Sequence, residues 1–169
     1  MRHVVRWTVS ACTIAAASIC AFAQSPSKPP AAPPAAAQCA GCHGAQGEGN
    51  SAANFPRIAG QPQYYLAKQL TDYANGRRRN AVMEPIAKGL AAADRDAIAA
   101  YYSQMAPTAP AATAQNTAGS GGRANELSRA GDARLGVQAC NNCHGPDGSG
   151  EPPVFPYLAG LDAKYLHAA

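Results

Sequence analysis

The chain has 169 residues and a charged fraction of 14%, and its 14 basic and 10 acidic side chains give a formal net charge of +4. Such a length suits one ordinary domain or two very small ones, and the composition excludes a disordered, self-repelling chain. Without the N-terminal segment considered next, the formal charge is +2, which is too weak a field to indicate a nucleic-acid partner.

The N-terminus has the parts of a secretory signal peptide. Arg2 and Arg6 precede seventeen uncharged, mostly apolar residues, and a small-x-small cleavage sequence stands at 21–23. A retained membrane anchor is the alternative, but a span needs about 20 apolar residues and this run is shorter and Ala-rich. We therefore expect residues 1–23 to be a signal peptide that directs the protein to the periplasm.

Two segments rich in Pro and Ala divide the rest of the chain. Residues 24–37 include "KPPAAPPAAA", which favours extended polyproline and cannot supply a core. The run "PTAPAATAQNTAGSGG" belongs to a predicted linker at 107–125. The predicted domains are therefore 38–106 and 126–169, preceded by a leader.

The sequence repeats across this linker. The stretch "FPRIAG" at 55–60 corresponds to "FPYLAG" at 155–160, and "CAGCHGAQGEG" corresponds to "CNNCHGPDGSG". Repetition of a whole unit indicates duplicated domains. The second copy stops at Ala169, which aligns with Gln69, so it has no counterpart of residues 70–105.

Hydrophobic spacing predicts helices in both units. In "QPQYYLAKQLTDYANG", Pro62 can occupy an early helical position and Gly76 can end the helix. A second amphipathic helix is predicted in "LAAADRDAIAAYYSQM" and an opening helix of the second unit in "ELSRAGDARLGVQAC". No β-alternation is present, so we expect an all-α fold with long loops. The expected apolar faces of the first two helices consist of Leu66, Leu70 and Tyr73, and of Ile98, Tyr101, Tyr102 and Met105.

The Cys-x-x-Cys-His motif presents two thiols and an imidazole on one face of a helical turn. Cys39 and Cys42 can add to the two vinyl groups of a haem, and His43 can offer a ring nitrogen to the iron. The second unit repeats this set with Cys140, Cys143 and His144. The sequence therefore predicts two covalently attached c-type haems.

Three other uses of the thiols remain open at this stage. Export would remove Cys12 and Cys20 and leave four cysteines in an oxidising compartment, where two disulfides could form. A zinc site would have to join both motifs across the linker, and a thioredoxin-like redox pair normally accompanies a βαβ pattern. Haem is favoured because the motif occurs twice and because a unit of about 70 residues needs an added staple.

Two methionines are candidates for the sixth iron ligand. Met105 shares the apolar stripe of Ile98 and is expected to be a core residue. Met83, in "NAVMEPIAKGL", lies in a predicted loop before a short helical run and is the better ligand. A thioether opposite an imidazole raises the potential and fills the site, as in an electron carrier rather than an enzyme.

The runs "CAGCHGAQGEG", "FPRIAGQPQYYLAKQL", "GRRRNAVMEPIAKGL" and "DRDAIAAYY", in this order, resemble the class I c-type cytochromes, specifically the dihaem cytochrome c4 type. The resemblance implies two tandem class I cytochrome c domains, the second one truncated. It implies His43 as proximal and Met83 as distal ligand, and a second haem on the motif at 140–144. It also implies periplasmic electron transfer from a quinol or dehydrogenase donor toward an acceptor such as a terminal oxidase.

The chain departs from the family pattern in two places. Ahead of the first motif stands "APPAAAQ", where Pro33 and Pro34 allow at most a turn in place of the family's N-terminal helix. The second unit stops before its own methionine, so either the sequence is a fragment or the second iron is open to solvent or an outside ligand. His167 aligns with Ala67 and is expected on a helix surface rather than on the iron.

The arginine run at 77–79 can meet either a haem propionate or an acidic partner, or it can be a solvated loop end. Three other functions also remain open. The second haem could act as an enzyme on peroxide or a small gas, the chain could be the electron-accepting subunit of a dehydrogenase complex, or it could be a disulfide-stapled structural module.

Overall fold

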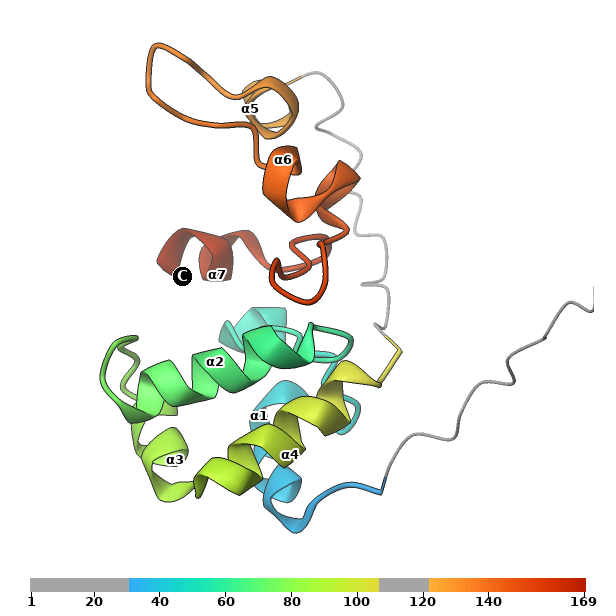
Figure 1. The fold of residues 1–169 in the computed structure, drawn as a ribbon, viewed down its shortest axis with the longest axis vertical. Helices are drawn as coiled ribbons and strands as arrows, with labels where there is room; N and C mark the ends of the chain where they lie inside the picture. Colours follow the sequence, from blue (N-terminus) through green and yellow to red (C-terminus); the bar gives the residue numbers. More distant parts are fainter. Residues whose placement is uncertain (1–30, 107–121) are drawn as a thin grey trace, which may run out of the picture.

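A computed structural model of the chain describes residues 31–106, here called the first unit, and 122–169, the second unit. The predicted signal peptide at 1–23, half of the predicted leader (24–30) and most of the predicted linker (107–121) lie outside the described residues. The first unit contains α1 (Ala37–His43), α2 (Gln63–Ala74), α3 (Met83–Gly89) and α4 (Ala92–Ser103), and the second contains α5 (Arg123–Ala130), α6 (Asn141–His144) and α7 (Ala163–Ala168) (Figure 1). Three 3₁₀ turns accompany them: η1 (Pro34–Ala36), η2 (Ser51–Ala53) and η3 (Pro146–Gly148).

The predicted all-α class is confirmed for the described residues. Their β contacts are three isolated bridges, Asn50 with Phe55, Asp132 with Val137 and Glu151 with Phe155. Each bridge closes a short loop rather than starting a sheet. None of the described helices is long and apolar enough to cross a bilayer.

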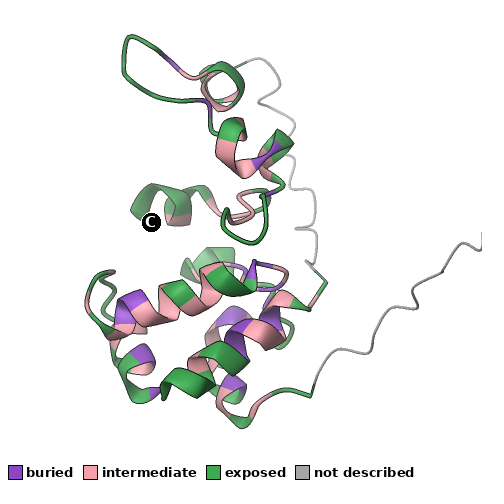
Figure 2. Ribbon diagram, viewed as in Figure 1, coloured by how far each residue is buried: buried purple, intermediate pink, exposed green. Residues whose placement is uncertain are grey.

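The core of the first unit lies where α2 packs on α3 and α4. Ile98 and Tyr102 of α4 are buried, and Leu66 and Leu70 of α2 pack against them, as the apolar spacing predicts. Met105 also packs against this cluster, which confirms that it is a core methionine. Buried positions are concentrated in the first unit, whereas most of the second unit is exposed or half-buried (Figure 2).

The helix boundaries follow local signals with one clear exception. Pro62 lies immediately before α2, and Gly76, with φ of +71°, follows its end. The predicted helix at 126–140 is wrong beyond residue 130. Gly131 has φ of +70°, and a Cβ there would lie 2.4 Å from the carbonyl oxygen of Val137. The backbone therefore leaves the helix at this glycine.

The segment ahead of α1 forms a single 3₁₀ turn, η1, in line with the expectation from its prolines. Ala36, at the end of this turn, is 3% exposed and belongs to the core cluster. The Tyr102 hydroxyl donates to the Ala36 carbonyl at 3.4 Å. This contact attaches the start of the first unit to α4 near its C-terminal end.

The two units meet through the repeated Phe-Pro-x-x-Ala-Gly segments. The Gln61 amide donates to the Tyr157 carbonyl and accepts from the Tyr157 N–H, both at 2.9 Å. Arg57 Nη2 donates to the Ala159 carbonyl at 2.9 Å. The short helix α7 lies alongside α2 (Figure 1), and the next section describes what it contributes there.

Candidate functional site

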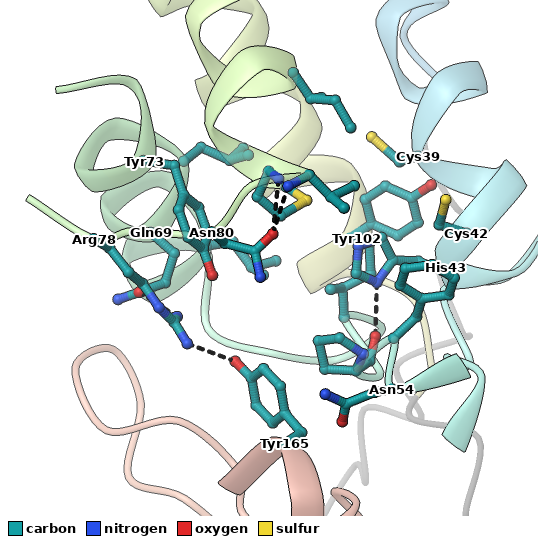
Figure 3. Close-up of a pocket in the computed structure, with 18 of the residues that line it drawn as sticks. Cys39, Cys42, His43, Asn54, Gln69, Tyr73, Arg78, Asn80, Tyr102 and Tyr165 are labelled. Atoms are coloured by element: carbon teal, nitrogen blue, oxygen red, sulfur yellow. Dashed lines mark hydrogen bonds between the residues drawn. The ribbon is translucent and has the colours of Figure 1, made fainter. Parts of the chain in front are cut away.

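A cavity of about 300 Å³ lies in the first unit. Its volume is at the lower end of the range of about 300–1,000 Å³ that is typical of small-molecule sites in proteins. Cys39, Cys42 and His43 of α1 lie along one wall (Figure 3). Met83 of α3 lines the cavity as well. The four side chains that the sequence predicted for the first haem are thus brought together. Apolar lining comes from Leu66, Leu70, Ile86, Ile98 and Tyr102.

The thiols of the first motif are free and face this cavity. Burial raises the pKa of the Cys39 thiol above its ordinary value. A protonated thiol is the reactant whose S–H adds across a vinyl group to give a thioether. The described part of the chain contains neither a disulfide among its four cysteines nor a group of three side chains able to hold a metal ion.

The His43 imidazole is held in one orientation. It is 8% exposed, and its Nδ1 lies 2.7 Å from the Pro56 carbonyl, to which it donates in the neutral tautomer. Burial lowers the pKa of His43 and the Pro56 carbonyl partly opposes this shift, so the ring is neutral near pH 7. The lone pair of Nε2 is then available to a metal, and the hydrogen bond at Nδ1 fixes the ring as a ligand requires.

A tight loop places the Pro56 carbonyl. Asn50 and Phe55 form a bridge, and the Gly49 N–H donates to the His43 carbonyl at 2.7 Å. Gly49 has φ of +84°, and a Cβ there would lie 2.6 Å from the Arg57 nitrogen. Only glycine allows the chain to pass so close, which explains the glycines that follow the motif.

The second unit repeats this arrangement. His144 Nδ1 lies 2.9 Å from the Pro156 carbonyl, and the Gly150 N–H donates to the His144 carbonyl at 2.6 Å. Cys143 is on α6 with His144, and Cys140 is at its N-cap position. The three predicted residues of the second motif are therefore together, outside the first cavity. His167 is exposed on α7, which confirms that it is a surface residue.

Met83 is the first residue of α3 rather than part of a loop. The sequence interpretation missed how this helix starts, because Val82 is its N-cap residue and makes no side-chain cap bond, and the side chain of Asn80 instead closes the turn at 81–82 that leads into the helix. Asn80 Oδ1 accepts from the Val82 and Met83 N–H groups at 3.0 and 2.9 Å. Asparagine is a strong N-capping residue, so the signal was present in the sequence.

The arginine run divides between three environments. Arg77 donates to Asp72 at 3.0 Å, and Arg79 is exposed at the cavity. Arg78 is half-buried beside the cavity and donates to Gln69 at 2.6 Å and to the Tyr165 hydroxyl at 3.3 Å. Its guanidinium also lies 5.0 Å from the ring centroid of Tyr73 and 5.8 Å from that of Tyr165. Arg78 is therefore the arginine of the run with fixed contacts at the cavity.

Two lining residues come from the second unit and were missed by the sequence interpretation. Tyr165 and Ala168 of α7 line the first cavity (Figure 3). Tyr165 is the counterpart of Tyr65 in the repeat, and the two phenols interact. Burial together with Tyr165 raises the pKa of Tyr65 to about 12. The repeat alignment pairs Tyr165 with Tyr65, but an alignment does not show that the two equivalent residues are in contact.

The residues present fit a haem. Two thiols and a neutral imidazole lie along one wall, a thioether lies at the same cavity, and the lining between them is largely apolar. A guanidinium, Arg78, stands beside the cavity, where the carboxylates of a porphyrin would find a cation. The donor set is that of class I haem ligation by His and Met.

Comparisons with known proteins agree. The family model described as Cytochrome c matches residues 34–106. The thiosulfate dehydrogenase electron acceptor of Thiomonas intermedia is 44% identical over 147 residues, covering 87% of this chain and 67% of the relative. Cytochrome c4 of Pseudomonas aeruginosa is 36% identical over 131 residues, covering 77% of this chain and 63% of the relative.

Solved structures show the same similarity. Reduced cytochrome c4 from Pseudomonas stutzeri has a TM-score of 0.67 and 34% identity, covering 77% of this chain and 71% of that one. The thiosulfate dehydrogenase TsdBA from Marichromatium purpuratum has a TM-score of 0.64 and 38% identity, covering 76% of this chain and 27% of that one.

This chain covers 67% of the length of the Thiomonas intermedia protein and 63% of that of the Pseudomonas aeruginosa protein. It covers 60% of a second thiosulfate dehydrogenase electron acceptor, from Stutzerimonas stutzeri. The matched part includes both Cys-x-x-Cys-His motifs and the cavity between α1 and α3. Motifs, helical fold and similarity thus point to one family. The chain belongs to the class I c-type cytochromes of the cytochrome c4 type, electron carriers whose cofactor is covalently attached c-type haem.

Proposed function

We propose that this cytochrome is a periplasmic dihaem shuttle that passes single electrons between redox proteins. Cys39 and Cys42 would hold the first haem through thioether bonds, and His43 and Met83 would supply its iron with a nitrogen and a sulfur ligand. The second is fastened by Cys140 and Cys143, with His144 as proximal ligand. The observation that carries the proposal is that His43, anchored through Nδ1 to the Pro56 carbonyl, lines one cavity with Met83.

The haem supplies a reversible one-electron iron couple, and the chain's own residues control it. A thioether ligand favours the ferrous state and occupies the position where oxygen would bind. The Pro56 carbonyl keeps the His43 ring oriented, and Leu66, Leu70 and Ile98 make the surroundings apolar. Each of these contacts limits rearrangement around the iron when it changes oxidation state.

The donor we favour is a dehydrogenase. Two of the relatives, from Thiomonas intermedia and Stutzerimonas stutzeri, are named thiosulfate dehydrogenase electron acceptors and are 44% and 42% identical to this chain. The carrier would take electrons from such an enzyme, as a free protein or as its electron-accepting subunit. It would pass them to an acceptor such as a terminal oxidase. Mixing the oxidised carrier with a thiosulfate dehydrogenase and thiosulfate should reduce its haem. The reduction should occur without any quinol-dependent donor in the mixture.

Mass and absorption test the cofactor assignment directly. Two covalent haems should add about 1.2 kDa to the mature polypeptide, and the pigment should stay with the protein in acidic acetone. Met83→Ala should leave this mass unchanged but remove the sulfur-to-iron charge-transfer absorption of the ferric protein. Met105→Ala is the matched control, because Met105 packs on the core, and it should keep the absorption. An unchanged spectrum in Met83→Ala would show that this thioether is not the ligand.

A further inference from the structure

The residue that fixes the backbone of Met83 is Asn80. Its Oδ1 accepts from the Val82 N–H at 3.0 Å and from the Met83 N–H at 2.9 Å (Figure 3). Its backbone N–H donates to Glu84 Oε1 at 3.0 Å, and its carbonyl accepts from the Glu84 N–H at 3.0 Å. This reciprocal set resembles a capping box, with Asn80 two residues ahead of the N-cap Val82 and Glu84 four residues after Asn80, and it closes the turn from which Met83 emerges.

Little else restrains this turn. Ala81 and Val82 are exposed, so packing restrains this turn less than it restrains α3, which is packed on α2 through the side of the helix that carries the buried Ala87. The helix that follows, α3, has seven residues, too few to be stable without outside contacts. The methionine side chain has three rotatable bonds and no preferred shape of its own. The position of its sulfur therefore depends on how firmly its backbone is held.

We infer that Asn80 is the positioning residue for the distal ligand: its cap holds the Met83 backbone so that the sulfur stays on the iron. The inference rests on the proposed ligation by Met83. Without the cap, the turn opens more often and the sixth coordination position becomes accessible to outside ligands. Loss of an asparagine cap shifts such an equilibrium by roughly 2- to 30-fold.

The chain contains a matched cap that lacks this role. Asn50 Oδ1 accepts from the Ala53 N–H at 3.1 Å and caps η2. Ala53 also lines the cavity, so Asn50→Ala removes the same kind of cap near the same cavity without touching Met83. The bridge from Asn50 to Phe55 is made by backbone groups, so alanine keeps it and leaves the Pro56 carbonyl in place. A purely structural effect of cap loss would be similar in both variants.

The experiment uses the full chain matured with haem, and its probe is imidazole, which competes for the sixth position of ferric iron. Asn80→Ala should keep the covalent haem mass, weaken the sulfur-to-iron absorption and raise the apparent imidazole affinity by roughly 2- to 30-fold. Asn80→Asp keeps the acceptor oxygen and should restore both readouts. Asn50→Ala should change neither. Met83→Ala changes the proposed ligand of the first iron only. The difference between its imidazole titration and that of wild type therefore gives the part of the response that belongs to the first iron.

Several results would overturn the inference. Equal imidazole affinities in Asn80→Ala and Asn50→Ala would do so, as would failure of Asn80→Asp to restore the absorption. If Asn80→Ala does not fold, Asn80→Ser tests the same point, because its hydroxyl also caps, and it should stay within about twofold of wild type. A Met83→Ala protein indistinguishable from wild type would remove the proposed ligation itself, and the role of Asn80 with it.

Discussion

The Tyr102 side chain shows how a single residue links the cavity to the fold. It is 1% exposed, lines the cavity, and its hydroxyl donates to the Ala36 carbonyl at 3.4 Å. Burial, the largest cause, raises the pKa of its phenol to about 12. The neutral phenol is therefore favoured by folding, because the anion would have to be buried.

This shift predicts a loss of stability in alkali. The unfolded phenol titrates near its ordinary pKa of about 10, so the stabilisation is complete below pH 10 and is lost as the pH rises toward 12. Two pKa units correspond to about 2–3 kcal/mol of unfolding free energy. Urea unfolding measured between pH 8 and pH 12 should show a steeper decline for wild type than for Tyr102→Phe. Parallel declines would mean that Tyr102 does not titrate on unfolding.

At the scale of elements, the loop after α1 matters as much as the helix. The motif on α1 supplies the thiols and His43, but the loop from Gly49 to Pro56 supplies the carbonyl that orients the ring. The spacing of the motif could be recognised from sequence because helical neighbours have fixed geometry. The contact between His43 and Pro56 spans thirteen residues of irregular chain and could not be read in the same way.

Two glycines of this region should respond in opposite ways to alanine. Gly49→Ala places a Cβ 2.6 Å from the Arg57 nitrogen at a positive φ, and we expect a loss of about 1–3 kcal/mol. Gly41 is in the middle of α1, and a Cβ added there would meet no atom within 4 Å, so Gly41→Ala should gain about 0.5–1 kcal/mol. Urea unfolding of the two haem-loaded variants measures both effects. Equal effects would show that the loop tolerates a side chain.

The cap of α3 illustrates why element boundaries escaped the sequence interpretation. The run "NAVMEPIAKGL" correctly indicated a short helix near Met83, and Pro85 fits its first turn. The helix nevertheless begins at Met83 itself, because Asn80 closes the preceding turn through Val82 and Met83. In α5 the same kind of local event, a left-handed glycine at 131, ended a helix that the pattern had extended.

At the scale of the whole molecule, hydrogen bonds between the repeated Phe-Pro-x-x-Ala-Gly regions join the two units. Gln61 pairs with the backbone of Tyr157 through two hydrogen bonds of 2.9 Å. Its counterpart in the second unit is Leu161, which cannot make such a pair. The repeat is therefore symmetric in sequence but not in the contacts that hold the units together.

Gln61→Leu, which introduces the residue of the second copy, should weaken this contact. The Tyr157 N–H and carbonyl would lose their partners, at a cost of about 1–3 kcal/mol. Calorimetry should show the second unit unfolding at least about 5 °C lower than in wild type. Gln63→Leu changes an exposed glutamine two residues away and serves as the control. Unfolding temperatures that match in the two variants would show that Gln61 does not join the units.

The sequence by itself determined the haem motifs, the helical class, the duplication and the choice of Met83 over Met105 as candidate ligand. The motifs and helices depend on residues within a few positions of one another, where backbone geometry fixes what shares a face. The duplication is visible directly as repeated sequence. Only the tertiary structure decided that Tyr165 of the second unit lines the first cavity and that Arg78 rather than its neighbours has fixed contacts there. Those contacts depend on how distant segments pack, and local spacing does not encode that packing.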